Sequence, residues 1–224
     1  MAQNDEFIRE VDEEYRRDRL AQIWQRYSGL IVGLAILLVV GVGGWRYWEY
    51  SQELKAQAAA ARYQDAIQLA AEPAKSDEAE KALEGLAKDA PGGYGLLTRF
   101  RLAAELGKGD PEDGAKAFDA LAADNGVEGR WRDLAKLRAA MLRMDGADPA
   151  AIRQSLEPLA APSNPWRHSA RELLGLSGLK TGDMDYAGRW FDQIAADRDT
   201  PASLRQRLDT YTALVAGGPV QVTQ

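Results

Sequence analysis

The 224-residue chain contains no cysteine and only one histidine, His168. The lack of cysteine excludes a disulfide framework and thiolate-based metal or redox sites. With a single histidine, a zinc site would need several carboxylates, and the acidic clusters do not have the spacing of an EF-hand loop. We therefore interpret His168 as a surface or helix-capping residue and expect neither a metal nor a cofactor.

Patterns typical of catalysis and of nucleic-acid binding are also missing. Ser169, next to His168, lacks the separate base and orienting acid that a nucleophile needs, and the segment 107–109 is not a phosphate-binding loop. The 28 Lys and Arg are outnumbered by 34 Asp and Glu, and no basic cluster is present to hold phosphates. The sequence predicts a protein that is not an enzyme and has no nucleic-acid partner and no small-molecule substrate. An enzyme would need a deep pocket with several carboxylates around His168.

The longest apolar run, from Tyr27 to Trp45, contains no charged residue. As a helix this run would be about 28 Å long, which matches the hydrocarbon thickness of a bilayer. A cleaved signal peptide is the alternative, but its apolar region would be about 7–15 residues long and would follow a short basic segment. Here the run is longer and the preceding segment is mostly acidic. We predict a transmembrane anchor over residues 27–48, in contact with the lipid bilayer.

Aromatic and basic side chains at both ends of this anchor are expected at the membrane–water interfaces, where Trp and Tyr are enriched. These residues are Trp24, Tyr27, Trp45, Arg46, Tyr47 and Trp48. Within the anchor, Gly29 and Gly33 form a small-xxx-small pair, which lets another transmembrane helix approach closely. We regard the two glycines as a candidate helix contact.

Residues 1–26 are predicted to form a charged amphipathic helix. Two interpretations of this segment remain open: it rests on the inner leaflet of the membrane, or it docks a cytoplasmic partner. More Lys and Arg lie close to the anchor on its N-terminal side than on its C-terminal side. The positive-inside rule therefore predicts a cytoplasmic N-terminus and places the rest of the chain outside.

Residues 49–218 repeat a pattern of about 35 residues, which is the tetratricopeptide period. Equivalent apolar residues are separated by 35, 38 and 35 positions: Leu83, Phe118, Leu156 and Phe191. Between them we predict second helices over 93–107, 128–144, 165–180 and 201–216. Such hairpins cannot bury their apolar faces alone, so they stack and share a core. The predicted fold class is all-α: an N-terminal transmembrane helix followed by a tetratricopeptide-like α-solenoid of stacked helical hairpins, with 219–224 as a disordered tail.

Capping residues mark the same repeat. Four residues with a side-chain oxygen each precede a proline and are predicted to cap a helix: Asp110, Asp148, Asn164 and Thr200. Asp77 and Glu80 have the spacing of a capping box. The longer interval of 38 residues predicts a longer loop or helix around residues 124–132.

Tryptophan residues supply the candidate protein-binding positions. In helical arrays, tryptophan usually packs in the seams between helices, but an exposed tryptophan suits a binding surface. Trp131 is flanked by Arg130 and Arg132, and Trp166 lies near the start of a predicted helix. We name these four residues as candidates for protein binding.

Two segments resemble a known family: Gly44-Trp45-Arg46-Tyr47-Trp48, followed by an Ala-rich helix that reaches Ala61-Arg62-Tyr63-Gln64, and the closing stretch 182–192. They are similar to the YfgM family of single-span inner-membrane proteins, which are ancillary subunits of the SecYEG translocon. The resemblance implies a bacterial inner-membrane protein with a periplasmic C-terminal domain. It also implies pairing with a PpiD-like membrane-anchored chaperone and a role in receiving secreted chains. The charged leader resembles the family variant with an extended cytoplasmic helix.

The residues alone support a membrane-tethered helical-repeat scaffold that binds protein. Two functions of such a scaffold remain open. One is the adaptor of the translocon, and the other is a scaffold for another cell-envelope assembly, such as the division or cell-wall synthesis machinery. The partners that copurify after mild solubilisation distinguish them.

Overall fold

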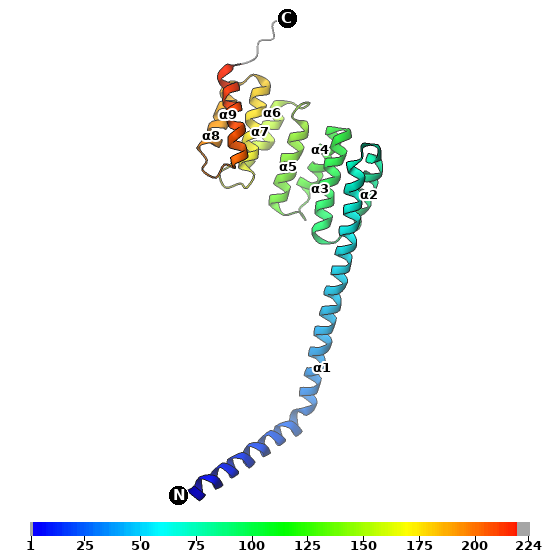
Figure 1. The fold of residues 1–224 in the computed structure, drawn as a ribbon, viewed down its shortest axis with the longest axis vertical. Helices are drawn as coiled ribbons and strands as arrows, with labels where there is room; N and C mark the ends of the chain where they lie inside the picture. Colours follow the sequence, from blue (N-terminus) through cyan, green and yellow to red (C-terminus); the bar gives the residue numbers. More distant parts are fainter. Residues whose placement is uncertain (1, 219–224) are drawn as a thin grey trace. The chain divides into compact units, whose positions relative to one another are not determined.

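The computed structural model describes the backbone of residues 2–218 and the side chains of residues 24–218. All regular elements in this range are helices, shown in Figure 1. They are α1 (Ala2–Ala71), η1 (Pro73–Lys75), α2 (Ser76–Asp89), α3 (Gly92–Gly109), α4 (Pro111–Ala123), α5 (Gly129–Arg143), α6 (Pro149–Leu156), η2 (Glu157–Ala160), α7 (Arg167–Thr181), α8 (Met184–Ala196) and α9 (Ala202–Gly217). The predicted all-α fold class is confirmed. The predicted tail 219–224 and the amphipathic face of the leader lie outside the described residues and side chains.

The chain divides into two compact units, Met1–Lys55 and Ala56–Gln224. In the first unit, α1 is uninterrupted and contains a window with a mean hydropathy of 2.2, none of which is buried. By length and composition, this helix is able to cross a membrane.

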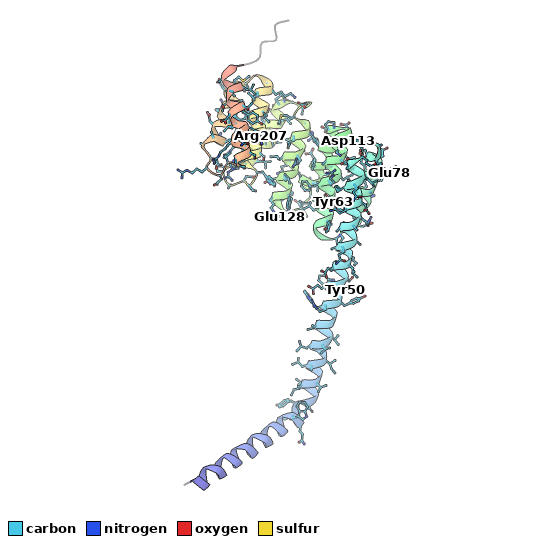
Figure 2. The ribbon with its side chains drawn as sticks, in the orientation of Figure 1. Tyr50, Tyr63, Glu78, Asp113, Glu128 and Arg207 are labelled. Carbon is cyan, nitrogen blue, oxygen red and sulfur yellow. The ribbon has the colours of Figure 1, made fainter. Side chains whose placement is uncertain are left out.

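Large apolar side chains on the first unit are exposed around the whole helix. Figure 2 shows side chains projecting on several sides of α1, including that of Tyr50. Leu30, Leu37 and Val39 are each about 70% exposed, at 70%, 69% and 72%. Soluble proteins rarely leave so large a contiguous apolar surface in water. A lipid bilayer around the predicted anchor would bury this apolar surface without any protein partner.

The second unit is a stack of helices in which neighbours along the chain pack together. Contacts join α2 with α3, α3 with α4, α4 with α5, α6 with α7, α7 with α8 and α8 with α9. Successive helices in this stack run in opposite directions, as Figure 1 shows. These are the helical hairpins that the sequence pattern predicts.

The core of this unit follows the predicted repeat. The four equivalent apolar residues are nearly inaccessible and lie on α2, α4, α6 and α8, the first helices of the predicted hairpins: Leu83, Phe118, Leu156 and Phe191. Three clusters of buried side chains fill the seams along the stack. The repeat register read from the sequence is therefore confirmed by burial, because residues about 35 positions apart fill equivalent seams.

Glycine allows two of the hairpins to close tightly. A Cβ atom on Gly114 of α4 would lie 2.5 Å from the Cα atom of Gly107 of α3. A Cβ atom on Gly175 of α7 would lie 2.3 Å from Cε1 of Phe191. Real Cβ contacts do not reach such distances, so both crossings require a residue without a side chain.

Some predicted helix caps are confirmed and others are wrong. The side chains of Asp110 and Asp148 accept hydrogen bonds from backbone N–H groups two residues on, at 2.8 and 3.0 Å. Thr200 does not cap α9, since Pro201 occupies the position before that helix and the Thr200 hydroxyl instead donates to the carbonyl of Ile194 at 2.7 Å. Asn164 accepts from the N–H of Trp166 in the turn before α7 begins, so it does not cap that helix.

The capping box predicted for Asp77 and Glu80 is also wrong. Helix α2 already begins at Ser76, so Asp77 lies inside its first turn. A carboxylate there still interacts favourably with the N-terminal end of the helix dipole. The longer connection predicted around residues 124–132 is present as a loop between the end of α4 and the start of α5.

Candidate protein-binding surfaces

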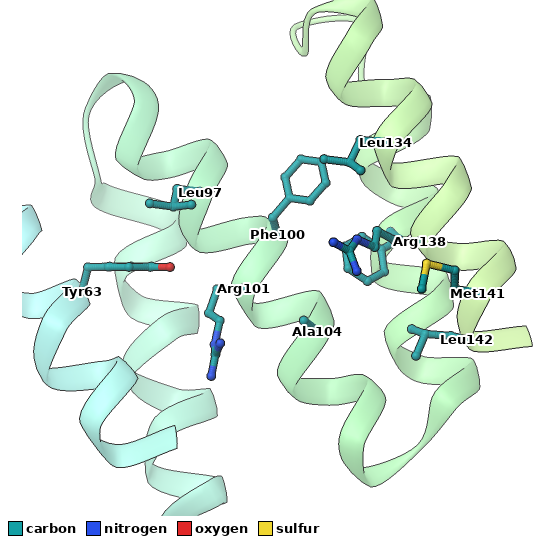
Figure 3. A pocket seen from close by; sticks show the side chains of 10 residues that line it. Tyr63, Leu97, Phe100, Arg101, Ala104, Leu134, Arg138, Met141 and Leu142 are labelled. Atoms are coloured by element: carbon teal, nitrogen blue, oxygen red, sulfur yellow. The ribbon is translucent and has the colours of Figure 1, made fainter. Parts of the chain in front are cut away.

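A groove of about 360 Å³ opens between three helices of the second unit. Figure 3 shows Tyr63 from the end of α1 on one side, Phe100 and Arg101 of α3 in the middle, and Met141 of α5 on the other side. Of these helices, α3 and α5 are the second helices of consecutive predicted hairpins and α1 precedes the first of them, so the groove runs across neighbouring repeats. A volume of this size is typical of binding pockets in proteins.

The floor of the groove is apolar and rigidly packed. The ring of Phe100 lies 5.8 Å from that of the buried Phe118 and meets Trp131 edge-on at 6.2 Å. Such aromatic pairs stabilise beyond the burial of area. On the rim, Leu97 and Met141 are 47% and 43% exposed. The groove therefore offers accessible apolar side chains on a preformed base.

The two arginines of the groove differ in their surroundings. Arg101 donates through Nη2 to Glu105, at 3.2 Å, and the carboxylate of Glu105 is also bound by Lys108 Nζ at 2.6 Å. Glu105 is only 1% exposed, so its charge is balanced within the protein. Arg138 of α5 forms no ion pair with any residue that the structure describes, although Lys136 and Arg143 on the same helix are paired.

The residues predicted around Trp131 are brought together at the start of α5. Trp131 is half-buried in the seam against Phe100, and the Arg130 guanidinium lies 5.4 Å from the centre of its ring. The indole Nε1 of Trp166 donates to the carbonyl oxygen of Arg130 at 2.8 Å. Arg132 donates to the Asn125 side chain at 3.2 Å. Trp131 and Trp166 thus help to hold this seam together, and their role in protein binding stays a prediction.

His168 is not the surface residue that the sequence predicts. Its side chain is only 13% exposed and lies 3.8 Å from the carboxylate of Asp197. Burial, followed by the nearby positive charge of Arg167, lowers the pKa of His168. The Asp197 carboxylate accepts hydrogen bonds from Arg167 and Arg171 at 2.8 and 3.2 Å. The hydrogen bond from Arg167 is the main reason that the pKa of Asp197 is lowered.

This cluster around Asp197 is a structural one. It ties the start of α7 to the loop after α8, and Arg171 within it is buried. Among the side chains of residues 24–218, no three His, Cys, Asp or Glu residues are grouped so that they could hold a metal ion. The hydrogen bond from Arg167 lowers the pKa of Asp197, so this carboxylate is a weak base.

The predicted membrane-interface residues all lie on the surface of the first unit. Five of them are exposed aromatic residues and the sixth is the exposed Arg46, which pairs with Glu49 at 3.2 Å: Trp24, Tyr27, Trp45, Arg46, Tyr47 and Trp48. Gly29 and Gly33 lie one helical turn apart, and a Cβ atom on either would meet nothing within 4 Å. Their functions at the membrane stay predictions.

Sequence reasoning did not single out the groove, although a signal for it exists. Three of its positions on α3 have counterparts on α5, 37 positions later and about one repeat further along: Leu97, Arg101 and Ala104 correspond to Leu134, Arg138 and Met141. Both sets have the i, i+4, i+7 spacing of one helical face. The conspicuous tryptophans drew attention instead, because single residues are easier to notice than a shared register.

The fold and this surface define the class of the protein. The tetratricopeptide repeat-like domain family matches residues 22–210, so the chain belongs to that family. A curated relative from Escherichia coli (strain K12), the "Ancillary SecYEG translocon subunit", is 28% identical over 193 residues, which cover 84% of this chain and 91% of the relative. No solved structure matches the chain. The family match begins at residue 22, before the apolar run, and therefore extends over parts of both units.

Proposed function

We propose that this chain is a membrane-anchored tetratricopeptide-like adaptor that serves as an ancillary subunit of the SecYEG translocon. The observation that carries the proposal is the relative of that name, which is similar along nearly its whole length. The exposed apolar helix and the repeat unit supply the two parts that such an adaptor needs: an anchor and a binding surface.

In this proposal the anchor spans the bacterial inner membrane with the N-terminus in the cytoplasm, and the repeat unit lies in the periplasm. The excess of Lys and Arg before the span supports this orientation. The exposed aromatics lie at the two interfaces, and Gly29 and Gly33 contact another transmembrane helix. The proposed domain limits are 1–26, 27–48, 49–218 and 219–224.

The adaptor acts by binding and not by catalysis. It works together with a PpiD-like membrane-anchored chaperone on secreted proteins as they leave the translocon. Anchoring the repeat unit beside the exit raises the effective concentration of a weak binding surface near its client. The apolar groove of the repeat unit supports a function in binding unfolded or partly folded chains.

Copurification tests the proposal. A tagged full-length chain is solubilised from inner membranes in a mild detergent, and SecY and the PpiD-like chaperone are probed by immunoblot. We expect both to copurify, whereas a matched chain with another single-span anchor in place of residues 27–48 should lose SecY if the glycine contact matters. The absence of both partners, or the recovery of division or cell-wall synthesis proteins in their place, contradicts the proposal.

Topology is tested separately. In spheroplasts, external protease should remove residues 49–218 and leave a tag at the N-terminus protected. A protected repeat unit contradicts the proposed orientation, even if the chain is found in the membrane fraction.

A further inference from the structure

The groove between α1, α3 and α5 carries a charge opposite to that of the protein as a whole. The chain has a net charge of −6, yet the residues that line the groove include two arginines and neither Asp nor Glu. The rest of the lining is apolar apart from the Tyr63 hydroxyl. A surface of this kind is complementary to an apolar segment that carries negative charge.

The positive charge of the groove is not fully neutralised by carboxylates of the described residues. Glu105 is shared between Arg101 and Lys108, so one carboxylate faces two cations. The Nε–H group of Arg101 is buried and has no hydrogen-bond acceptor among the described residues. Arg138 forms no ion pair with a described residue, while its neighbours Lys136 and Arg143 do. Arg138 therefore retains its donors for a ligand, and Arg101, whose side chain is 32% exposed, keeps a positive charge that the shared carboxylate balances only in part.

The spacing of the two arginines fits a polypeptide ligand. Arg101 and Arg138 occupy the same position in consecutive repeats, and each has an apolar residue one turn before it, Leu97 or Leu134. The groove thus presents the same pair of features twice, side by side. A chain in which apolar and acidic residues alternate or recur matches both copies at once.

We propose that this groove binds a segment of another polypeptide that combines apolar side chains with carboxylates, the carboxylates pairing with Arg101 and Arg138. This inference rests on the proposed function and deepens it, because it states the chemistry of the client segment. The apolar side chains of the bound segment pack against Leu97, Phe100 and Met141. Its carboxylates accept hydrogen bonds from the two guanidinium groups. Neutral or basic apolar segments bind more weakly, because they leave the donors of the arginines without acceptors.

The test uses the full chain in nanodiscs of zwitterionic lipid and a short fluorescein-labelled peptide in which Leu and Phe recur together with Glu. Fluorescence polarisation gives its dissociation constant, and a peptide with Gln in place of Glu is the comparison. We expect the Glu peptide to bind about three- to tenfold more tightly, and the difference to shrink at high salt. Equal affinity for the two peptides, or equal binding to empty nanodiscs, overturns the proposal.

Matched variants locate the binding. Arg138→Gln should abolish the preference for Glu, whereas Lys136→Gln removes the same charge from another face of α5 and should leave the preference intact. Arg138→Glu should favour a peptide with Lys in place of Glu. For the apolar part, Leu97→Ser should weaken both peptides, while Leu214→Ser, at an equally exposed leucine of α9, should weaken neither. If Arg138→Gln and Lys136→Gln behave alike, the groove is not the site.

The two proposals fail in different ways. Selective binding of the Glu peptide without copurification of SecY contradicts the translocon function and keeps the groove. Copurification of SecY without a preference between the peptides contradicts the groove and keeps the adaptor.

Discussion

Arginine residues are paired differently in two regions of the repeat unit, the groove on α3 and α5 and the seam between α7 and α9. In the second region, Arg167 and Arg171 both donate hydrogen bonds to Asp197. Arg207 of α9 forms a bidentate ion pair with Glu172 of α7, at 2.8 and 3.0 Å. In the first region, Arg101 shares its carboxylate with Lys108, and Arg138 has no paired carboxylate within the described chain. Satisfied ion pairs fix the geometry of a seam, whereas arginines with spare donors are available to a ligand. The paired arginines stabilise the seam between α7 and α9, whereas the two groove arginines are available to a ligand. Arg143, which lies on α5 outside the groove, is paired with Glu112 and Asp119 and belongs with the arginines of the seam.

The largest expected effect comes from the core of the α7–α9 region. Phe191 is fully buried and stacks on Tyr211 with ring centres 5.0 Å apart. Phe191→Ala should lower the free energy of unfolding by about 3–5 kcal/mol, because it removes a large side chain and leaves a cavity. Urea unfolding of the full chain in detergent, followed by circular dichroism, measures the change.

The matched variant in the groove is Leu97→Ala, whose side chain is half exposed. Its free energy of unfolding should differ from that of the wild type by no more than about 0.5 kcal/mol, as for other surface positions. A similar loss for the two variants would show that the groove is part of the core.

A smaller effect is expected where α7 meets α8. Gly175→Ala places a Cβ atom against the ring of Phe191, and the resulting overpacking should cost about 1–3 kcal/mol. Gly109→Ala, at the end of α3, is the control, because a Cβ atom there meets nothing within 4 Å. It should leave the urea midpoint unchanged or raise it slightly, since Ala favours the helix more than Gly. If Gly175→Ala is also neutral, the close approach is not required.

The cluster around Asp197 should make the stability of this region depend on pH. The pKa of Asp197 is lowered in the folded state, chiefly by the hydrogen bond from Arg167. The contribution of Asp197 to the free energy of unfolding is therefore complete above the unfolded pKa of about 3.9. It is lost gradually as the pH falls from that value toward the much lower folded pKa. The urea midpoint of Asp197→Asn should lie below that of the wild type at neutral pH, and the two should converge in acid.

Two other groups bear on the reading of this experiment. Arg167 and Arg171 stay charged throughout, but His168 lies 3.8 Å from Asp197, and its lowered pKa means that its protonation opposes folding below about pH 6.5. Because the Asp197 charge raises the pKa of His168 against the larger effect of burial, the effect of His168 differs between the two proteins, and the comparison is therefore also made in a His168→Gln background. The midpoint difference should shrink steadily as the pH falls below about 3.9 and is not expected to vanish at once, because the folded pKa of Asp197 lies well below the unfolded one. A difference that keeps its full neutral-pH size down to about pH 2 contradicts the assignment to the Asp197 carboxylate.

Regular periodicity explains how far the sequence predicts this fold. Residues such as Leu83 and Phe118 recur because each hairpin buries the same position, so the repeat is visible without coordinates. Caps are harder to predict. Thr200 lies one residue before the N-cap position of α9 and Asp77 two residues after that of α2, and only the exact start of each helix decides which residue caps it. The environment of His168 depends on Asp197, about 30 residues away, and no local pattern shows that contact. Predicting the groove from the sequence requires both the register of the repeats and the knowledge that Arg138 forms no ion pair with a described residue.

The smallest expected effect separates the two kinds of arginine directly. Arg207 is 49% exposed, so its pairing with Glu172 should contribute only about 0.2–1 kcal/mol to the free energy of unfolding. Arg207→Gln should therefore lower the urea midpoint slightly, and the loss should diminish at high salt because exposed pairs are screened. Arg138→Gln, which breaks no pair within the described chain, should leave the midpoint unchanged at every salt concentration. A loss of stability on Arg138→Gln equal to that on Arg207→Gln would mean that Arg138 serves the fold, and the contrast between the groove arginine and the seam arginine would no longer hold.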